Sequence, residues 1–272
     1  MREIFEQLAE DIAKGPVDPV ERAKELSRRE LPKRFYELVS VEERDGAFAI
    51  LLDGRTVKTP GRRALSFDRE HVAEAVAAEW ELQDKMIDPA TMPLTRLAHS
   101  AIDAVADRFD EVADEVTRYA GNDAVCYRAD APQELVARQT QHWDPVVAWA
   151  NERLGGKFQL IGGLIHQPQE EVLLKNYREA LNKFTPLELS AIHTVTSITG
   201  SALFALGLAE KAFDDDAVWA AAFVDEDWNA EQWGQDSEAI RVRNYKQDEF
   251  LASALVLADT PEEIGADVVI SE

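Results

Sequence analysis

The chain has the sequence KRFYELVSVEERDGAFAILLDGRTVKTPGRRAL at residues 33–65, and this stretch decides the fold class. Runs rich in β-branched and aromatic residues alternate there with Asp45-Gly46, Asp53-Gly54 and Pro60-Gly61. Asp-Gly between such runs is a strong signal for a β-hairpin, because glycine reaches the positive φ that a tight turn requires. The stretch therefore predicts a small antiparallel meander, with strands within 35–43, 47–52, 55–59 and 64–67.

A helix should follow the meander and cover its sheet. Asp68 is expected to cap this helix, because its carboxylate can accept a bond from a free N–H group of the first turn. Val72, Val76 and Trp80 recur at four-residue spacing and so share one apolar face. Meander and helix together predict a compact α+β unit that ends near Ile87.

The segment DPATMP, residues 88–93, is the best candidate for a domain boundary, because it has two prolines and no periodicity. Helical spacing dominates after it. The predicted fold class is α+β, with a small antiparallel β-containing N-terminal domain at 1–88 and a larger all-helical C-terminal domain at 89–272.

Within the C-terminal part, apolar spacing from Leu97 to Val116 predicts one long helix that closes near Gly121. Residues 134–143 and 145–154 predict a pair of helices, with Asp144 as the cap of the second. The apolar run at 158–165 is the later strand candidate, and a return of this strand to the N-terminal sheet is left open.

Thr185-Pro186-Leu187-Glu188 has the residues of a capping box followed by a helix start. Residues 189–209 then contain no charged side chain. That length would suffice for a membrane span, but Ser and Thr crowd its first half and no basic flank orients it. We therefore expect a buried central helix and no stable membrane insertion.

Composition indicates an ordinary globular protein without a disulfide framework. The 29 basic and 52 acidic residues give a formal net charge of −23, which opposes binding to nucleic acid and favours basic partners. Cys126 is the single cysteine and has an apolar context, so we expect a buried, inert thiol in a reducing compartment. Residues 3–13 predict a short amphipathic helix that packs on the body or acts as a contact arm, and 19–30 predict a solvated helix.

The stretch AFDDDAVWAAAFVDEDWNAEQWGQDSEAI, residues 212–240, is the strongest candidate for a functional surface. Three of the six tryptophans lie in it among carboxylates, and no Lys or Arg occurs between Lys211 and Arg241. Rigid aromatic side chains supply contact area, and a field of one sign steers a basic partner. The plainer interpretation is a core helix whose aromatic residues face inward and whose acids face water.

The motifs of common enzyme classes are missing from the sequence. It contains no GxGxxG, HExxH or GxSxG motif, and its five histidines are widely separated. Residues 225–236 resemble a calcium loop, but Ala230 stands where the sharp turn needs glycine, so we expect neither a metal site nor a cofactor. An enzyme remains only as an alternative, a carboxylate-based hydrolase that would use the acids of 225–238 with a metal.

Three blocks of sequence together resemble the assembly chaperones that bind the free alpha subunit of the ATP synthase catalytic sector. They are KRFYELVSVEERDGAFAILLDGRTVKTPGRRAL (33–65), IDPATMPLTRLAHSAID (87–103), and the segment from Trp219 through WGQDSEA to Ala239. ARQTQHWDPVVAWA (137–150) is similar as well. The resemblance covers residues from about 35 to 270, and residues 1–30 fall outside it.

The resemblance implies a chaperone that is not an enzyme, needs no cofactor, and shields an unassembled alpha subunit, and we expect it to be a monomer. Because no presequence is evident, we expect a bacterial cytoplasm, or the mitochondrial matrix for a processed eukaryotic chain. A generic acidic scaffold without a single client is a second alternative. The candidate client-binding residues are Trp219, Phe223, Glu226, Trp233, Asp236 and Glu238.

Overall fold

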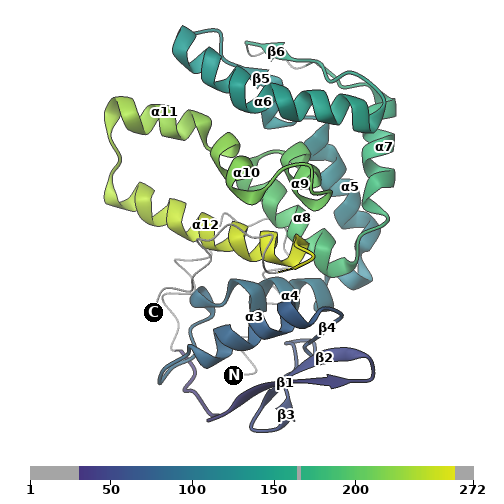
Figure 1. The fold of residues 1–272 in the computed structure, drawn as a ribbon, viewed down its shortest axis with the longest axis vertical. Helices are drawn as coiled ribbons and strands as arrows, with labels where there is room; N and C mark the ends of the chain where they lie inside the picture. Colours follow the sequence, from purple (N-terminus) through teal and green to yellow (C-terminus); the bar gives the residue numbers. More distant parts are fainter. Residues whose placement is uncertain (1–30, 164–166, 261–272) are drawn as a thin grey trace. The chain divides into compact units, whose positions relative to one another are not determined.

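The computed structural model describes residues 31–163 and 167–260, and contacts within the chain divide it into two compact units, residues 1–108 and 109–272. The helices predicted at 3–13 and 19–30 lie outside the described residues. The architecture is α+β, as predicted, with antiparallel strands in the first unit and mainly helices in the second (Figure 1).

The first unit is built on the predicted meander. Asp45 and Gly46 have φ of 55° and 80°, and Asp53 and Gly54 have φ of 48° and 74°, so both Asp-Gly pairs turn the chain as expected. In the sheet β1 pairs with β2, and β2 pairs with both β3 and β4, all antiparallel. The strands are β1 (Val39–Arg44), β2 (Ala47–Leu52), β3 (Arg55–Thr56) and β4 (Ser66–Phe67).

Helix α3 (Glu70–Glu81) packs against β1, β2 and β4 and buries Val72, Val76 and Trp80, as the spacing predicted. The predicted cap is wrong, because the helix begins one residue later, at an N-cap Arg69 whose side chain makes no capping bond. The short helix η1 (Pro89–Thr91) leads into α4 (Pro93–Asp103).

Helix α4 is held to α3 by a buried carboxylate. Glu79 accepts hydrogen bonds from the N–H groups of Leu94 (2.7 Å) and Thr95 (2.8 Å) and from the Thr95 hydroxyl (2.7 Å). The contacts therefore group α4 with the first unit, whereas DPATMP predicted a boundary before it. Whether 1–88 and 89–272 are domains that fold independently stays a prediction.

The long helix predicted from Leu97 to Val116 is wrong, because the chain breaks after Asp103. The Asp103 carboxylate accepts bonds from the Thr59 hydroxyl (2.6 Å) and the Gly61 N–H (2.7 Å), which fixes the end of α4 against the meander. Ala104 leaves the helical conformation, with φ of −124°, and the short helix η2 (Val105–Asp107) follows.

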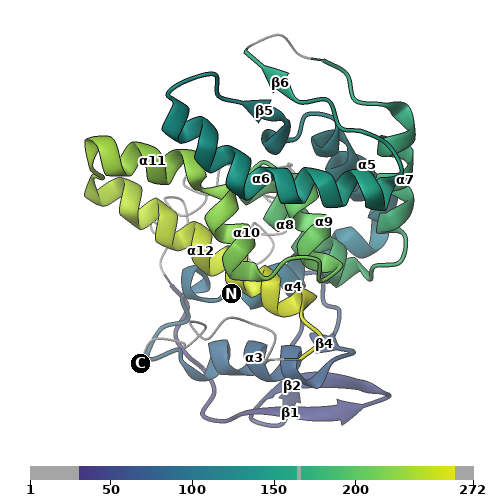
Figure 2. The same cartoon turned by 45° about the horizontal axis from the view of Figure 1, so that its top comes forward.

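The second unit is a helical assembly around a buried pair, α8 and α9 (Figures 1 and 2). The capping box at Thr185 and Glu188 is present, as predicted. Residues 189–209 are mostly buried, as expected, although Ser197 is exposed. They form two helices, because Gly200 adopts φ of 69° and Ser201 caps the second helix. The helices are α5 (Phe109–Ala120), η3 (Ala124–Cys126), α6 (Gln133–Leu154), α7 (Glu171–Leu181), α8 (Pro186–Thr199), α9 (Ala202–Ala209), α10 (Asp215–Ala222), α11 (Val224–Trp233) and α12 (Ser237–Leu257).

Two further predictions in this unit need correction. The expected pair at 134–143 and 145–154 is the single helix α6, which continues through Pro145, and Asp144 pairs with Arg128 (2.8 Å) instead of capping a helix. The strand expected at 158–165 is only β6 (Ile161–Gly162). It pairs in parallel with β5 (Tyr127–Arg128), not with the N-terminal sheet.

Candidate functional site

The acidic and aromatic stretch 212–240 folds into α10, α11 and the start of α12. Helices α11 and α12 run antiparallel as a hairpin, with their connection at the outer end (Figures 1 and 2). Gly234 makes that connection possible, because its φ of 78° and ψ of 174° suit glycine and strain other residues. We call residues 231–241 the hairpin tip, and every one of them is exposed.

The aromatic residues at the base of the hairpin face inward. The ring of Trp219, a half-buried residue, lies 4.1 Å from that of Phe223 and 5.2 Å from that of Phe250. Phe223 is 4% exposed and Phe250 is 1% exposed. Of the candidate residues, Trp219 and Phe223 thus form an internal cluster that supports the hairpin.

Trp233 is the opposite case, with 86% of its surface exposed at the end of α11. Ile240, on the first turn of α12, is 45% exposed and belongs to the same tip. Sequence reasoning missed Ile240, although an apolar residue inside the run DSEAIR is a detectable signal. The tip therefore presents large apolar side chains to solvent.

The candidate acids of the tip and of α11 differ in their local contacts. The Asp236 carboxylate accepts a bond from the Ala239 N–H (2.7 Å) and so caps α12. Both oxygens of Glu238 accept from Arg241 at 2.7 Å. Glu226, on the exposed side of α11, has no hydrogen bond or ion pair with any residue in the described part of the chain.

In the folded chain, basic side chains from outside the acidic stretch lie beside its carboxylates. This corrects the expectation from sequence that the stretch carries a field of one sign. Arg138 of α6 donates to both oxygens of Glu231 at 2.7 and 2.6 Å, and this bonding lowers the pKa of Glu231. Arg243 of α12 pairs with Asp227, and its guanidinium lies 5.0 Å from the ring of Phe223. Bases that are distant in sequence thus hold the carboxylates of α11.

Contacts with α6 hold the hairpin against the rest of the second unit. The Arg138 guanidinium also lies 5.0 Å from the ring of Trp228, which is 9% exposed. Gln139 donates to Asp225 (2.8 Å), and the Trp143 indole donates to the Ala221 carbonyl (2.7 Å). One face of α6 therefore anchors α10 and α11, so the tip is presented on a defined support.

No group of three or more His, Cys, Asp or Glu side chains within 31–163 and 167–260 is arranged to hold a metal ion. The residues that resemble a calcium loop lie mostly on α11, so their side chains do not converge as loop ligands would. Cys126 is buried, and burial raises the pKa of its thiol to about 12, which makes it unreactive near neutral pH. Burial likewise lowers the pKa of His99 to about 4.

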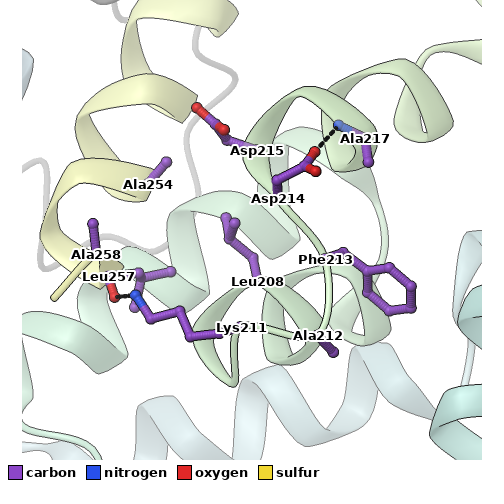
Figure 3. A pocket seen from close by; sticks show the side chains of 10 residues that line it. All are labelled: Leu208, Lys211, Ala212, Phe213, Asp214, Asp215, Ala217, Ala254, Leu257 and Ala258. Carbon is purple, nitrogen blue, oxygen red and sulfur yellow. Dashed lines mark hydrogen bonds between the residues drawn. The ribbon is translucent and has the colours of Figure 1, made fainter. Parts of the chain in front are cut away.

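A cavity of about 530 Å³ lies where the end of α9, the start of α10 and the end of α12 meet (Figure 3). Lys211 donates to the Leu257 carbonyl at one side, and Asp214 accepts from Ala217 (2.7 Å) at the other. Lys211 has a positive φ of 60°, which had no recognised signal in the sequence. The lining residues are Leu208, Lys211, Ala212, Phe213, Asp214, Asp215, Ala217, Ala254, Leu257 and Ala258.

None of the helices within the described ranges is both long enough and apolar enough to cross a membrane.

Comparison with known proteins identifies the family. Residues 33–151 match the model of the ATP12 chaperone protein family. A curated relative, the mitochondrial protein atp12 of Schizosaccharomyces pombe, is 21% identical over 244 residues, which are 85% of this chain and 84% of that protein.

Solved structures agree. A crystal structure of a candidate chaperone from Agrobacterium tumefaciens has 40% identity and a TM-score of 0.80 over 92% of this chain and 95% of its own. Atp12 from Paracoccus denitrificans has 36% identity and a TM-score of 0.76, over 83% of this chain and 97% of its own. The chain therefore belongs to the ATP12 family of ATP synthase assembly chaperones.

Proposed function

We propose that the chain binds the unassembled alpha subunit of ATP synthase, shields its aggregation-prone interface and promotes assembly of the catalytic sector. A subunit that has not met its partner exposes a large apolar interface, which self-associates in water. A chaperone for such a subunit needs an exposed apolar surface of its own and must itself stay free of aggregation. The chain would bind its client without catalysing a reaction, in a bacterial cytoplasm or a mitochondrial matrix.

The observation that carries the proposal is Trp233, an indole that is 86% exposed at the end of a supported hairpin. Tryptophan is among the residues that most often dominate binding energy, because it buries a large area with few rotatable bonds. Leaving it in water costs solubility, which favours a role in contact. Trp233 and Ile240 would form the apolar centre of the contact, and Glu226, Asp236 and Glu238 its acidic rim.

Trp219 and Phe223 have a supporting role in this proposal. Both belong to the internal aromatic cluster under the hairpin, with Arg243 and Lys246 over the ring of Phe223. Substitution of either residue would disturb the hairpin itself and would affect the contact with the client only indirectly. The apolar contact itself is therefore assigned to Trp233 and Ile240 of the tip.

The alternatives have less support. A metal-dependent hydrolase needs converging carboxylates, whereas the acids of α11 are spread over a helix and two of them are engaged by arginines. A generic acidic scaffold would bind many basic proteins with similar affinity. Capture from a lysate separates it from a dedicated chaperone, which should retain one dominant band of alpha subunit.

The decisive experiment compares how well Trp233→Ser and Leu160→Ser suppress aggregation of the alpha subunit, with aggregation measured by light scattering. Leu160 is a matched control, because it is also an exposed apolar residue of the second unit, at 50% exposure. We expect Trp233→Ser to raise the Kd for the alpha subunit about thirtyfold, a loss of about 2 kcal/mol. Leu160→Ser should protect the client as the wild type does.

Both variants should keep the melting temperature of the wild type, because neither side chain is in the core. Equal protection by Trp233→Ser and wild type would remove the tip from the proposal. Failure of the wild type itself to bind the alpha subunit would remove the proposed client.

A further inference from the structure

The first unit carries an apolar surface that the fold itself does not explain. Phe35 is 54% exposed, Leu38 72%, Leu82 56% and Met86 38%. These are four of the eight large apolar side chains that are exposed in the described part of the chain. We call them the Phe35 patch.

The residues of the Phe35 patch come from two segments that lie side by side. Lys33 forms an antiparallel bridge with Met86, and the Arg34 N–H donates to the Lys85 carbonyl (2.9 Å). The Arg34 guanidinium also donates to the Glu81 carbonyl (3.0 Å), at the end of α3. Residues 33 and 34 are thus bonded along 81–86, which brings Phe35 to the side of the unit that carries Leu82 and Met86. Leu38 follows three residues later, where its N–H donates to Asp53 (2.9 Å).

Tyr36, which alternates with Phe35, points the other way. It is 5% exposed, and its hydroxyl donates to the Trp80 carbonyl (2.6 Å). The rings of Tyr36 and Phe35 are nearly perpendicular, with centroids 5.3 Å apart. The backbone under the patch is therefore well fixed, so the exposure of Phe35 is a property of a defined surface.

We propose that the Phe35 patch is the docking site of the chain's own N-terminal segment, through Ile4, Phe5, Leu8 and Ile12. These four residues recur at helical spacing, and the sequence predicts that they form one apolar face. Such a face needs an apolar partner. The patch is an apolar surface of suitable kind.

The position at which the segment joins the described chain favours this occupant over any other molecule. The Pro32 carbonyl accepts from the Ile87 N–H (2.8 Å), so the chain enters the first unit directly beside the patch. Residues 13–31 can span up to about 3.3 Å each, which is ample for a return to the patch. A tether of this length gives an effective concentration of about millimolar, far above that of a free partner.

Methionine methyl NMR on the full chain tests the proposal, because the three methionines include one in the patch and one in the core. Met86 reports on the patch, and Met92, which is 2% exposed, reports on the integrity of the fold. The variant Phe5→Glu with Leu8→Glu removes the apolar face. The control Gln7→Glu with Lys14→Gln makes the same change in net charge on the polar side.

We expect the Phe5→Glu, Leu8→Glu variant to shift the Met86 methyl resonance and to increase its broadening by a soluble gadolinium chelate. The control variant should leave Met86 as in the wild type, and Met92 should be constant throughout. Equal broadening of Met86 in all three proteins overturns the proposal. So does protection of Met86 that appears only at high protein concentration, which would indicate a second copy, or only on adding alpha subunit, which would indicate the client.

Discussion

Glu79 shows how a single buried carboxylate can couple the fold of the first unit to pH. Burial raises the pKa of Glu79 to about 7, because the loss of hydration outweighs the bonds from Thr95 and Leu94 and the charge of Arg96. All three donors suit the ionised form. The site therefore holds a carboxyl group whose proton is bound more tightly in the folded chain than in the unfolded one.

The sign of the pH dependence follows from that difference. Between about pH 4.5 and pH 7 the folded state keeps a proton that the unfolded state has lost, so the free energy of unfolding falls as the pH rises through this window. The change attributable to Glu79 is at most about 3 kcal/mol. Glu79→Gln, neutral at every pH, should lose this part of the slope.

Denaturant unfolding at several pH values checks this prediction. Glu81→Gln is the matched control, because Glu81 lies on the same helix with its side chain 61% exposed. The control should follow the wild-type profile. Parallel profiles for Glu79→Gln and wild type would show that Glu79 does not titrate in this window.

Glu238 requires a different design, because it is paired with Arg241. Glu238→Lys removes that pair and also places two cations near each other on α12, so it mixes local strain with any effect on the client. Glu226→Lys reverses a charge on the same hairpin without breaking a bond among the described residues. The two substitutions together separate charge from local structure.

If the acidic rim contacts the client, Glu226→Lys and Glu238→Lys should both weaken protection of the alpha subunit, and Glu238→Gln should weaken it less. Melting temperature and aggregation should be measured in parallel for all three. Full protection by the two lysine variants, with both still folded, would exclude the rim from the contact. Loss in Glu238→Lys alone would indicate an effect on α12 instead.

At the scale of elements, the sequence predicted correctly two turns and a capping box that depend on neighbouring residues. The turns at Asp45-Gly46 and Asp53-Gly54 and the capping box at Thr185 are all present, because each depends on residues close in sequence. The break after Asp103 was not predicted, since its cause is a bond to Gly61, distant in the chain. Continuation of α6 through Pro145 was missed for a similar reason, because α6 packs against α7, α9, α10 and α11, which follow it later in the chain.

In the candidate site, too, features set by neighbouring residues could be predicted and features set by distant contacts could not. Periodicity could show that Trp219 and Phe223 share a face, but not which face is buried. The exposure of Trp233 follows from its position at the end of α11, next to the turn at Gly234. The pairing of Asp227 and Glu231 with Arg243 and Arg138 depends on the packing of α6 and α12, so the stretch looked free of bases when only its own residues were considered.

The pair between Arg138 and Glu231 leads to a prediction about α11 as an element. Arg138→Gln removes the bidentate bond and the cation over Trp228, so α11 should open more often from α6. Hydrogen exchange of the amides of 224–233 should therefore increase. Because the pair is exposed, the global unfolding midpoint should change little.

Arg153→Gln is the control, because Arg153 also forms a bidentate pair, with Glu210, at the other end of α6. It should leave exchange in α11 unchanged. If exchange in α11 were the same in Arg138→Gln and wild type, the burial of Trp228 and the bond from Gln139 to Asp225 would be enough to hold the helix.

At the scale of the whole molecule, the formal charge of −23 acts at distances where individual pairs no longer matter. Pairing inside the hairpin neutralises several acids locally, so the long-range field comes mainly from the rest of the surface. Such a field affects the rate of encounter with a basic or polar interface more than the lifetime of the complex. Steering and contact should therefore be separable by kinetics.

The association rate constant with the alpha subunit should fall as salt rises, because the screening length shortens from about 30 Å at 0.01 M to about 8 Å at 0.15 M. Surface-immobilised alpha subunit and stopped-flow mixing can both supply the rate. Trp233→Ser should retain this salt dependence and dissociate faster, since it removes apolar contact and leaves the charge unchanged. An association rate that stays constant between the two salt concentrations would exclude steering and leave apolar contact at the tip as the main source of affinity. A salt dependence that disappears in Trp233→Ser would instead show that charge and contact act through one inseparable step.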